Sequence, residues 1–178
     1  NAFVGYHAGY LNTTGSANSY FGVQAGAENN VNSPGTGSGN SFFGYASGKG
    51  TISGFNNTYL GSFSGGGSLG GNNTAIGSEA LIGSSTLSNA TAIGFQSSVT
   101  QDDSLVLGRI NGVNGSTADT KVGIGITAPN ARLHVQNGHV YVGSPGQGMI
   151  LKSPNGAICR LFSIDNAGAM VLTPIACP

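Results

Sequence analysis

A short pattern recurs along the first 108 residues and constrains the fold more than any other feature of this sequence. Each repeat starts with a small or polar residue, continues with apolar residues and ends in glycine, at residues 1–5, 18–22, 40–44, 57–61, 73–77, 90–94 and 104–108. The final glycines are 17, 22, 17, 16, 17 and 14 residues apart, at Gly5, Gly22, Gly44, Gly61, Gly77, Gly94 and Gly108. A near-constant period of this length predicts a solenoid.

Each repeat is too short for a helix, and its aromatic and β-branched residues favour a strand. We therefore expect residues 1–108 to form a parallel β-solenoid with one coil for each final glycine. Coils stacked about 4.8 Å apart would place equivalent residues above one another, so the asparagines that open the repeats would form a hydrogen-bonded ladder. The glycines would turn the corners with positive φ. The predicted ladder consists of Asn18, Asn40, Asn57 and Asn73.

Side chains alternate between the two faces of a strand, so each repeat presents one residue to one side and its neighbours to the other. We expect the residues one and three before each glycine, such as Ile76 and Thr74, to lie inside. The residue two before the glycine would then face outward, and four aromatic residues on an almost uncharged surface would need a cover. We predict that identical chains cover them in an intertwined homo-oligomer, through Phe3, Tyr20, Phe42 and Tyr59.

Composition and charge exclude some partners. The chain has 178 residues, of which 32 are glycine and 7% are charged, and its net charge is zero with the six basic residues scattered. No basic patch indicates nucleic acid or an anionic membrane, and no apolar run predicts membrane insertion. Because the pattern is already running at Asn1, we expect a segment of a longer protein.

The composition changes after the repeats. Nine of the 12 charged residues follow position 101. We expect a repeat domain at 1–108, a connector at 109–131 and a small antiparallel module at 132–178. An Asn137–Gly138 turn predicts a hairpin that pairs Val135 with Val140 and Leu133 with Val142. A three-stranded meander should follow at residues 149–153, 158–164 and 169–173, with turns at 154–156 and 165–168.

The two cysteines lie in this module. Reflecting Cys159 through the second turn of the meander places it opposite position 174, three residues from Cys177. That distance permits a disulfide if the tail turns back, which would suit an oxidising, extracellular location.

No pattern indicates catalysis, a cofactor or a metal. The glycine-rich stretch within the insertion at 30–39 lacks the context of a phosphate-binding loop, and His134 and His139 lack a third ligand. Glu28 and Glu79, the only acids before position 101, would lie roughly 14 Å apart along the stack, too far for glycoside hydrolysis. Ice binding through Thr58, Thr74 and Thr91 is disfavoured because we expect these residues inside.

The repeats also resemble a known family. Residues 72–77, 89–94 and 103–108 resemble the head repeats of YadA-type trimeric autotransporter adhesins, which implies a left-handed parallel β-roll assembled as a homotrimer. The earlier repeats and residues 121–135 resemble surface-fibre proteins of Bacteroidetes and phage tail fibres. The chain departs from the adhesins because it has no coiled-coil neck and no membrane anchor.

The resemblance implies a non-enzymatic subunit of an extracellular fibre or adhesin that mediates cell adhesion. A receptor, glycan or matrix component could be its ligand. The alternative is a phage or contractile-injection tail fibre that binds a receptor. The same roll serves both, so genomic neighbourhood would separate them.

Overall fold

The computed structural model describes residues 1–27 and 35–177, and over these residues the chain is all-β with no helix. It forms two compact units, Asn1–His134 and Val135–Pro178. The expected connector at 109–131 is thus part of the first unit. Residues 30–34 of the expected insertion, and Glu28, lie outside the described residues.

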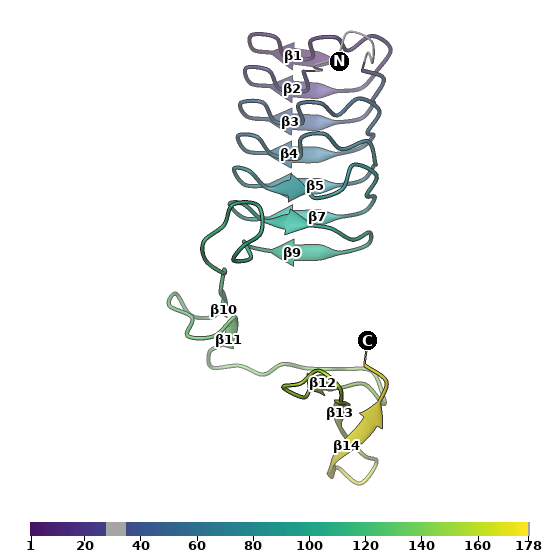
Figure 1. Ribbon diagram of the computed structural model, residues 1–178, viewed down its shortest axis with the longest axis vertical. Coiled ribbons are helices and arrows are strands. Elements are labelled where there is room, and N and C mark those ends of the chain that lie inside the picture. The colour runs from purple at the N-terminus through teal and green to yellow at the C-terminus, as the bar shows by residue number, and fades with distance from the viewer. Residues whose placement is uncertain (28–34, 178) are drawn as a thin grey trace. The chain divides into compact units, whose positions relative to one another are not determined.

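The first unit contains the predicted parallel β-solenoid, with one strand in each repeat (Figure 1). All neighbouring strands in its seven-stranded sheet pair in parallel, and equivalent residues of successive repeats lie side by side. The left-handed sense of the roll stays a prediction. The strands, in sheet order, are β1 (Ala2–Val4), β2 (Ser19–Phe21), β3 (Ser41–Phe43), β4 (Thr58–Leu60), β5 (Thr74–Ile76), β7 (Thr91–Ile93) and β9 (Leu105–Leu107).

The opposite wall of the solenoid contains fewer strands. Among the described residues, the strands that pair there are β6 (Leu81–Ile82) and β8 (Ser98–Val99), in parallel. Earlier coils carry isolated parallel bridges, from Asn12 to Gly35 and from Phe55 to Gly71. Turns therefore make up most of this wall, while the seven-stranded sheet gives the unit its one continuous face.

The predicted glycine corners are present. Gly61 has a φ of +140°, and a Cβ atom added there would lie 2.4 Å from the carbonyl oxygen of Gly77 in the next coil. All seven final glycines have positive φ. The stacking distance between coils, as well as the backbone angle, therefore requires glycine at this position.

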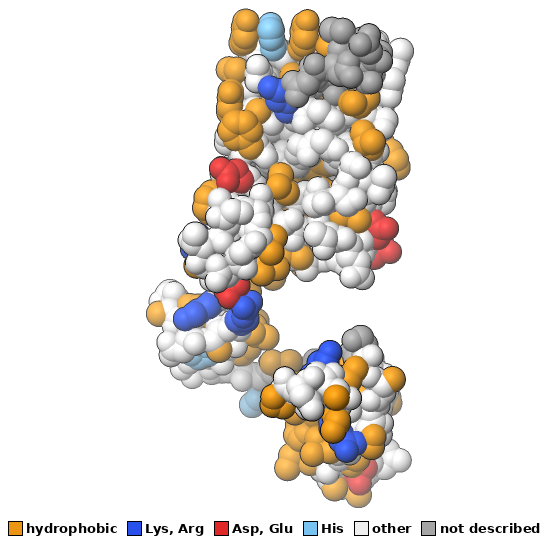
Figure 2. Space-filling view, in the orientation of Figure 1, with side chains coloured by type: hydrophobic (Ala, Val, Ile, Leu, Met, Phe, Trp, Pro, Cys, Tyr) orange, Lys and Arg blue, Asp and Glu red, His pale blue; other side chains and the backbone are white. Residues whose placement is uncertain are grey.

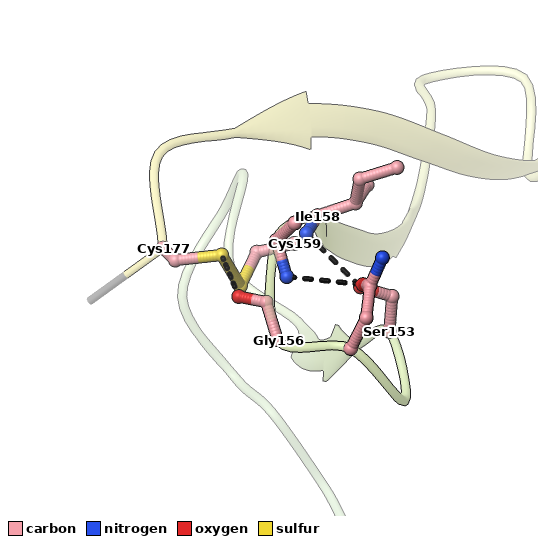
Figure 3. The surroundings of a disulfide bond; sticks show 7 residues. Ser153, Gly156, Ile158, Cys159 and Cys177 are labelled. Atoms are coloured by element: carbon pink, nitrogen blue, oxygen red, sulfur yellow. Dashed lines mark hydrogen bonds between the residues drawn. A yellow bond between two sulfur atoms is a disulfide. The ribbon is translucent and has the colours of Figure 1, made fainter.

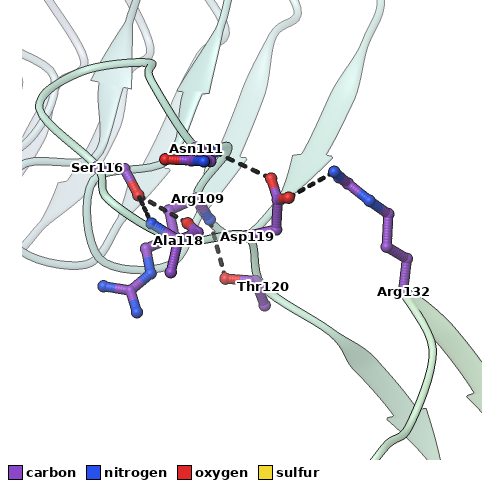
Figure 4. Close-up of polar contacts among 7 residues, drawn as sticks. All are labelled: Arg109, Asn111, Ser116, Ala118, Asp119, Thr120 and Arg132. Atoms are coloured by element: carbon purple, nitrogen blue, oxygen red, sulfur yellow. Dashed lines mark hydrogen bonds and ion pairs between the residues drawn. The ribbon is translucent and has the colours of Figure 1, made fainter.

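The expected turn-rich linker is an ordered loop against the last coil (Figure 4). The amide of Arg109 donates to Thr120 Oγ1, and the amide of Asn111 donates to Asp119 Oδ1. Asn114 Nδ2 donates to the carbonyl of Glu79, two coils back. The first two contacts hold the loop together, and the third ties it to the solenoid.

The predicted hairpin around Asn137–Gly138 is wrong. β11 (Leu133–Val135) pairs instead with β10 (Val122–Ile124), and residues 140–142 are not in a strand. A type I′ turn needs positive φ at both central residues. Asn137 has a φ of 54°, but Gly138 is not among the positive-φ glycines. The amide of Val122 donates to the carbonyl of Arg132, so an upstream segment takes the pairing edge.

The second unit contains the predicted antiparallel meander, β12 (Met149–Lys152), β13 (Cys159–Ile164) and β14 (Met170–Ile175). Its register differs by one residue from the expectation, because Cys159 lies opposite Ile175 rather than position 174. The amide of Asp165 donates to the carbonyl of Ala169, which leaves a three-residue loop at 166–168 and moves the centre of the turn to Ala167.

The predicted disulfide between Cys159 and Cys177 is confirmed (Figure 3). The two Cα atoms are 5.2 Å apart, and the tail after β14 turns back to reach Cys159. Cys159 is the only buried residue among residues 135–177. The disulfide therefore lies at the one buried position of the described part of the module.

We expect reduction of this disulfide to destabilise the module by about 3 kcal/mol, because the bond closes a loop with a sequence separation of 18 residues. The difference is measured by unfolding the second unit in urea, with and without reductant, and by monitoring the unfolding through hydrogen exchange. The solenoid holds no cysteine and serves as the internal control. Equal exchange in both conditions would contradict the prediction.

Candidate functional site

The predicted outward aromatic ladder lies inside the solenoid, which corrects the assignment of the two strand faces. Tyr20, Phe42 and Tyr59 are at most 2% exposed, and Phe3 of the first coil packs on Tyr20. Successive ring centroids are 4.8 Å apart with nearly parallel planes. Tyr20, Phe42 and Tyr59 are therefore buried in a stacked core and cannot be the interface between chains, and Phe3, which is 38% exposed, ends the stack at the first coil.

The opposite wall explains why rings fit inside. The Phe42 ring packs on Gly48, where an added Cβ would lie 2.3 Å from it, and the Tyr59 ring packs on Gly65 in the same way. In the two coils where the ring is replaced by Ala75 or Ala92, the glycine is replaced by Leu81 or Ser98. Large residues of the opposite wall fill the core there, namely Ile82, Leu87 and Val99.

That exchange of ring and glycine was a usable signal in the sequence. A ring two residues before each corner glycine accompanies a glycine four residues after it, as in Phe42 with Gly48. Alternation along one strand relates its residues to each other but does not say which set is buried. Comparison between the two walls of the coil would have shown that the rings point inward.

The predicted asparagine ladder is present, although its hydrogen bonds run to the backbone rather than between side chains. At Asn57, the third asparagine of the ladder, Oδ1 accepts from the amide of Asn73 at 2.8 Å, and Nδ2 donates to the carbonyl of Gly70 at 3.0 Å. Asn18, Asn40 and Asn73 repeat this pattern. All four residues are at most 1% exposed. The ladder satisfies buried backbone groups at one corner of the coils that carry these asparagines, and it ends at the amide of Ala90.

We expect Asn57→Ala to lower the free energy of unfolding by about 2 to 6 kcal/mol. The change leaves the amide of Asn73 and the carbonyl of Gly70 buried without their partner, at about 1 to 3 kcal/mol each. The matched control is Asn56→Gly, since Asn56 is exposed and has a left-handed φ that glycine tolerates. Similar urea midpoints for the two variants would argue against the ladder.

The pKa of the Tyr59 hydroxyl reflects its burial in a core that excludes water. Burial raises its pKa to about 12, although interactions with the side chains of Ser68 and Asn73 lower it. Because the unfolded tyrosine ionises near pH 10, a folded state that holds the neutral form loses stability as the pH rises from 10 towards 12.

We therefore expect the wild-type chain to lose about 2 kcal/mol more than Tyr59→Phe between pH 9 and about pH 11.5. Below pH 9, where tyrosine is neutral in both states, this term is absent. Urea unfolding of both chains at the two pH values measures the difference. A parallel loss in both chains would show that Tyr59 is not the responsible group.

The outer face of the sheet carries a continuous column of apolar side chains, hereafter the outer column. Each member stands one residue before a corner glycine, and the rings of Phe21 and Phe43 stack at 5.0 Å. No side chain on the outward strand positions is charged. All members are partly or largely exposed, and they are Val4, Phe21, Phe43, Leu60, Ile76, Ile93 and Leu107. Figure 2 shows one face of the first unit, on which hydrophobic side chains are dispersed among polar ones and charged side chains are few.

The threonines were also assigned to the wrong side. Thr58, Thr74 and Thr91 lie three residues before the corner glycines and so share the outward face with the outer column. Their expected inward position was the reason for disfavouring ice binding, and that reason no longer holds. The threonine row spans three of the seven strands, whereas the outer column spans all seven.

Side chains that could take part in catalysis or metal binding are scattered among the described residues. His134 Nδ1 accepts from the amide of Asn130, Glu79 accepts from Gln96, and Lys49 donates to Gln24. No three His, Cys, Asp or Glu residues gather into a metal site within residues 1–27 and 35–177. The same part of the chain contains no helix with the length and hydropathy to span a bilayer.

The geometry thus defines the class of protein. It is a parallel β-solenoid followed by a small antiparallel module that has an internal disulfide. Comparison with protein-family models, curated proteins and solved structures found no match. The resemblance to adhesin and fibre repeats therefore stays a hypothesis based on the repeat residues.

Proposed function

We propose that this chain is a non-enzymatic structural subunit of an extracellular fibre or adhesin, and that it assembles as a homotrimer through the outer column. The supporting observation is the unbroken apolar column along the sheet. With a strand spacing of about 4.8 Å, seven strands carry it over roughly 29 Å. An uncharged apolar surface of this extent is unusual for a monomer in water.

The burial energy favours association. Completing the burial of a large apolar side chain that is 38% to 56% exposed contributes about 1 kcal/mol, and five members of the outer column are in that range, while Ile76 and Ile93 are less exposed. The regular spacing suits a partner with the same repeat, because only another sheet of this kind matches it along the whole length. The number three comes from the resemblance to trimeric adhesin heads.

The extracellular location rests on the disulfide between Cys159 and Cys177, since such bonds persist in oxidising compartments. A fibre in that setting would attach to a surface receptor, a glycan or a matrix component. A phage or contractile-injection tail fibre is the alternative, and it shares the same physical support. The genes that flank this one distinguish the two.

Ice binding is a second candidate because Thr58, Thr74 and Thr91 point outward. The bulky rings of Phe21 and Phe43 stand in the neighbouring column on the same sheet face. We favour assembly because the apolar column covers every strand. A thermal-hysteresis measurement on the purified chain tests ice binding directly, and measurable hysteresis would support it.

The test of the proposal is the mass of the native assembly. We expect a trimer for the wild-type chain, and dissociation to monomer at micromolar concentration for the double variant Phe21→Ser and Phe43→Ser. The control is Phe63→Ser with Phe95→Ser, which removes two rings outside the outer column that are 50% and 49% exposed, somewhat more than Phe21 and Phe43. A monomeric wild-type chain, or equal masses for both double variants, would refute the assignment.

A further inference from the structure

The second unit has an apolar sheet face that its own chain leaves open. In the register of the meander, Met149 lies opposite Phe162, and Phe162 lies opposite Leu172. Ile164 lies opposite Met170, and Leu151 shares their side of the sheet because side chains alternate. We call this set the module face, and its members are Met149, Leu151, Phe162, Ile164, Met170 and Leu172.

The module face is more exposed than a stable small domain allows. Its members other than Phe162 are between 52% and 75% exposed. The preceding segment adds Val140 and Val142 at one end, where they line a hollow of about 230 Å³ with Met149, Phe162 and Ile164. With Cys159 as the only buried residue of the described part of the unit, the disulfide and one chain do not make a core.

We propose that the module face packs against the module faces of the other chains in the same assembly. This inference rests on the proposed self-association of the solenoid. In a symmetric assembly, equivalent faces of the chains meet around the symmetry axis. An apolar face is suited to this, because it can pack against the same apolar face of another copy. Arg160 shares this side of the sheet and is half-buried, at the end near the disulfide, where its guanidinium can reach water at the rim.

The size of the face identifies its occupant. Three strands about 4.8 Å apart, of four, six and six residues that rise about 3.3 Å each, present roughly 250 Å². An independent partner needs about 800 Å² on each side for a stable complex. A second copy needs less, because association of the solenoids holds the modules at an effective concentration in the millimolar range. The face therefore fits a tethered copy of this chain better than a free protein.

Two adjacent residues of β12 give a matched test. Leu151 is 56% exposed on the module face, and Ile150 is 48% exposed on the opposite side of the same strand. Each is changed to serine in the full chain. Hydrogen exchange of residues 149–175 is measured beside the native mass. We expect exchange at least tenfold faster in Leu151→Ser, little change in Ile150→Ser, and trimers in both because the outer column is intact.

The outcomes separate the two proposals. A trimeric wild-type chain in which Leu151→Ser and Ile150→Ser exchange alike would overturn the module interface and leave the solenoid assembly standing. A monomeric wild-type chain would overturn both, because the modules would then have no tether. Faster exchange in Ile150→Ser than in Leu151→Ser would place the interface on the other side of the sheet and would also refute this inference.

Discussion

Gly61→Ala is expected to lower the free energy of unfolding by more than about 4 kcal/mol. The new Cβ would lie 2.4 Å from the carbonyl oxygen and 2.5 Å from the carbonyl carbon of Gly77, which belong to rigid backbone in the next coil. The φ of +140° adds strain of about 1 to 3 kcal/mol, because side chains rarely adopt it. Neither coil can move away without breaking the strand pairing between β4 and β5.

The control for Gly61→Ala is Gly67→Ala. Gly67 also has a positive φ, of +77°, but an added Cβ meets no atom within 4 Å. We expect a loss of about 1 to 2 kcal/mol, which is the cost of the left-handed backbone alone. Urea unfolding of both variants measures the contact between coils. Equal losses would show that close stacking does not explain the corner glycines.

Phe42→Ala is expected to cost about 3 to 5 kcal/mol, as for a buried aromatic residue that is truncated without repacking. Its ring is fully buried between Tyr20 and Tyr59, with centroids 4.8 Å away on each side. Gly48, which faces the ring, has no side chain that could fill the space. The stack would be interrupted at its centre.

Phe95→Ala provides the comparison for Phe42→Ala, since Phe95 is 49% exposed and lies beyond the corner Gly94. We expect it to change stability by less than about 0.5 kcal/mol. Urea midpoints at fixed protein concentration decide the matter. If Phe42→Ala were as mild as Phe95→Ala, the stacked aromatic core would not contribute to stability as we infer.

Much of the architecture could be predicted because it follows from local pattern and repetition. The period of the final glycines predicted the solenoid, and each repeat is a strand. The meander was predicted from its turn residues, which form short connections between adjacent strands. The disulfide followed from the meander, and the one-residue shift in register still leaves Cys159 and Cys177 with Cα atoms 5.2 Å apart.

The candidate site was less predictable, and the reason lies in the two walls of the coil. Alternation places Phe42 and Phe43 on opposite sides, but only the wall that carries Gly48 determines that Phe42 enters the core. The apolar surface available to a partner is therefore the column of Phe43. The alternation of side chains along each strand was predicted correctly, but the face that lies in the core was assigned wrongly.

By itself, the sequence determined the coil period, the glycine corners, the asparagine ladder and the cysteine pair, because each depends on spacing along the chain or on identical residues stacking. Only the tertiary structure decided which side of the sheet is the core and which segment pairs with Leu133–Val135. Both depend on contacts between segments that are distant in the sequence. There, the volume of a ring facing a glycine, or an upstream strand at an open edge, outweighs local preference.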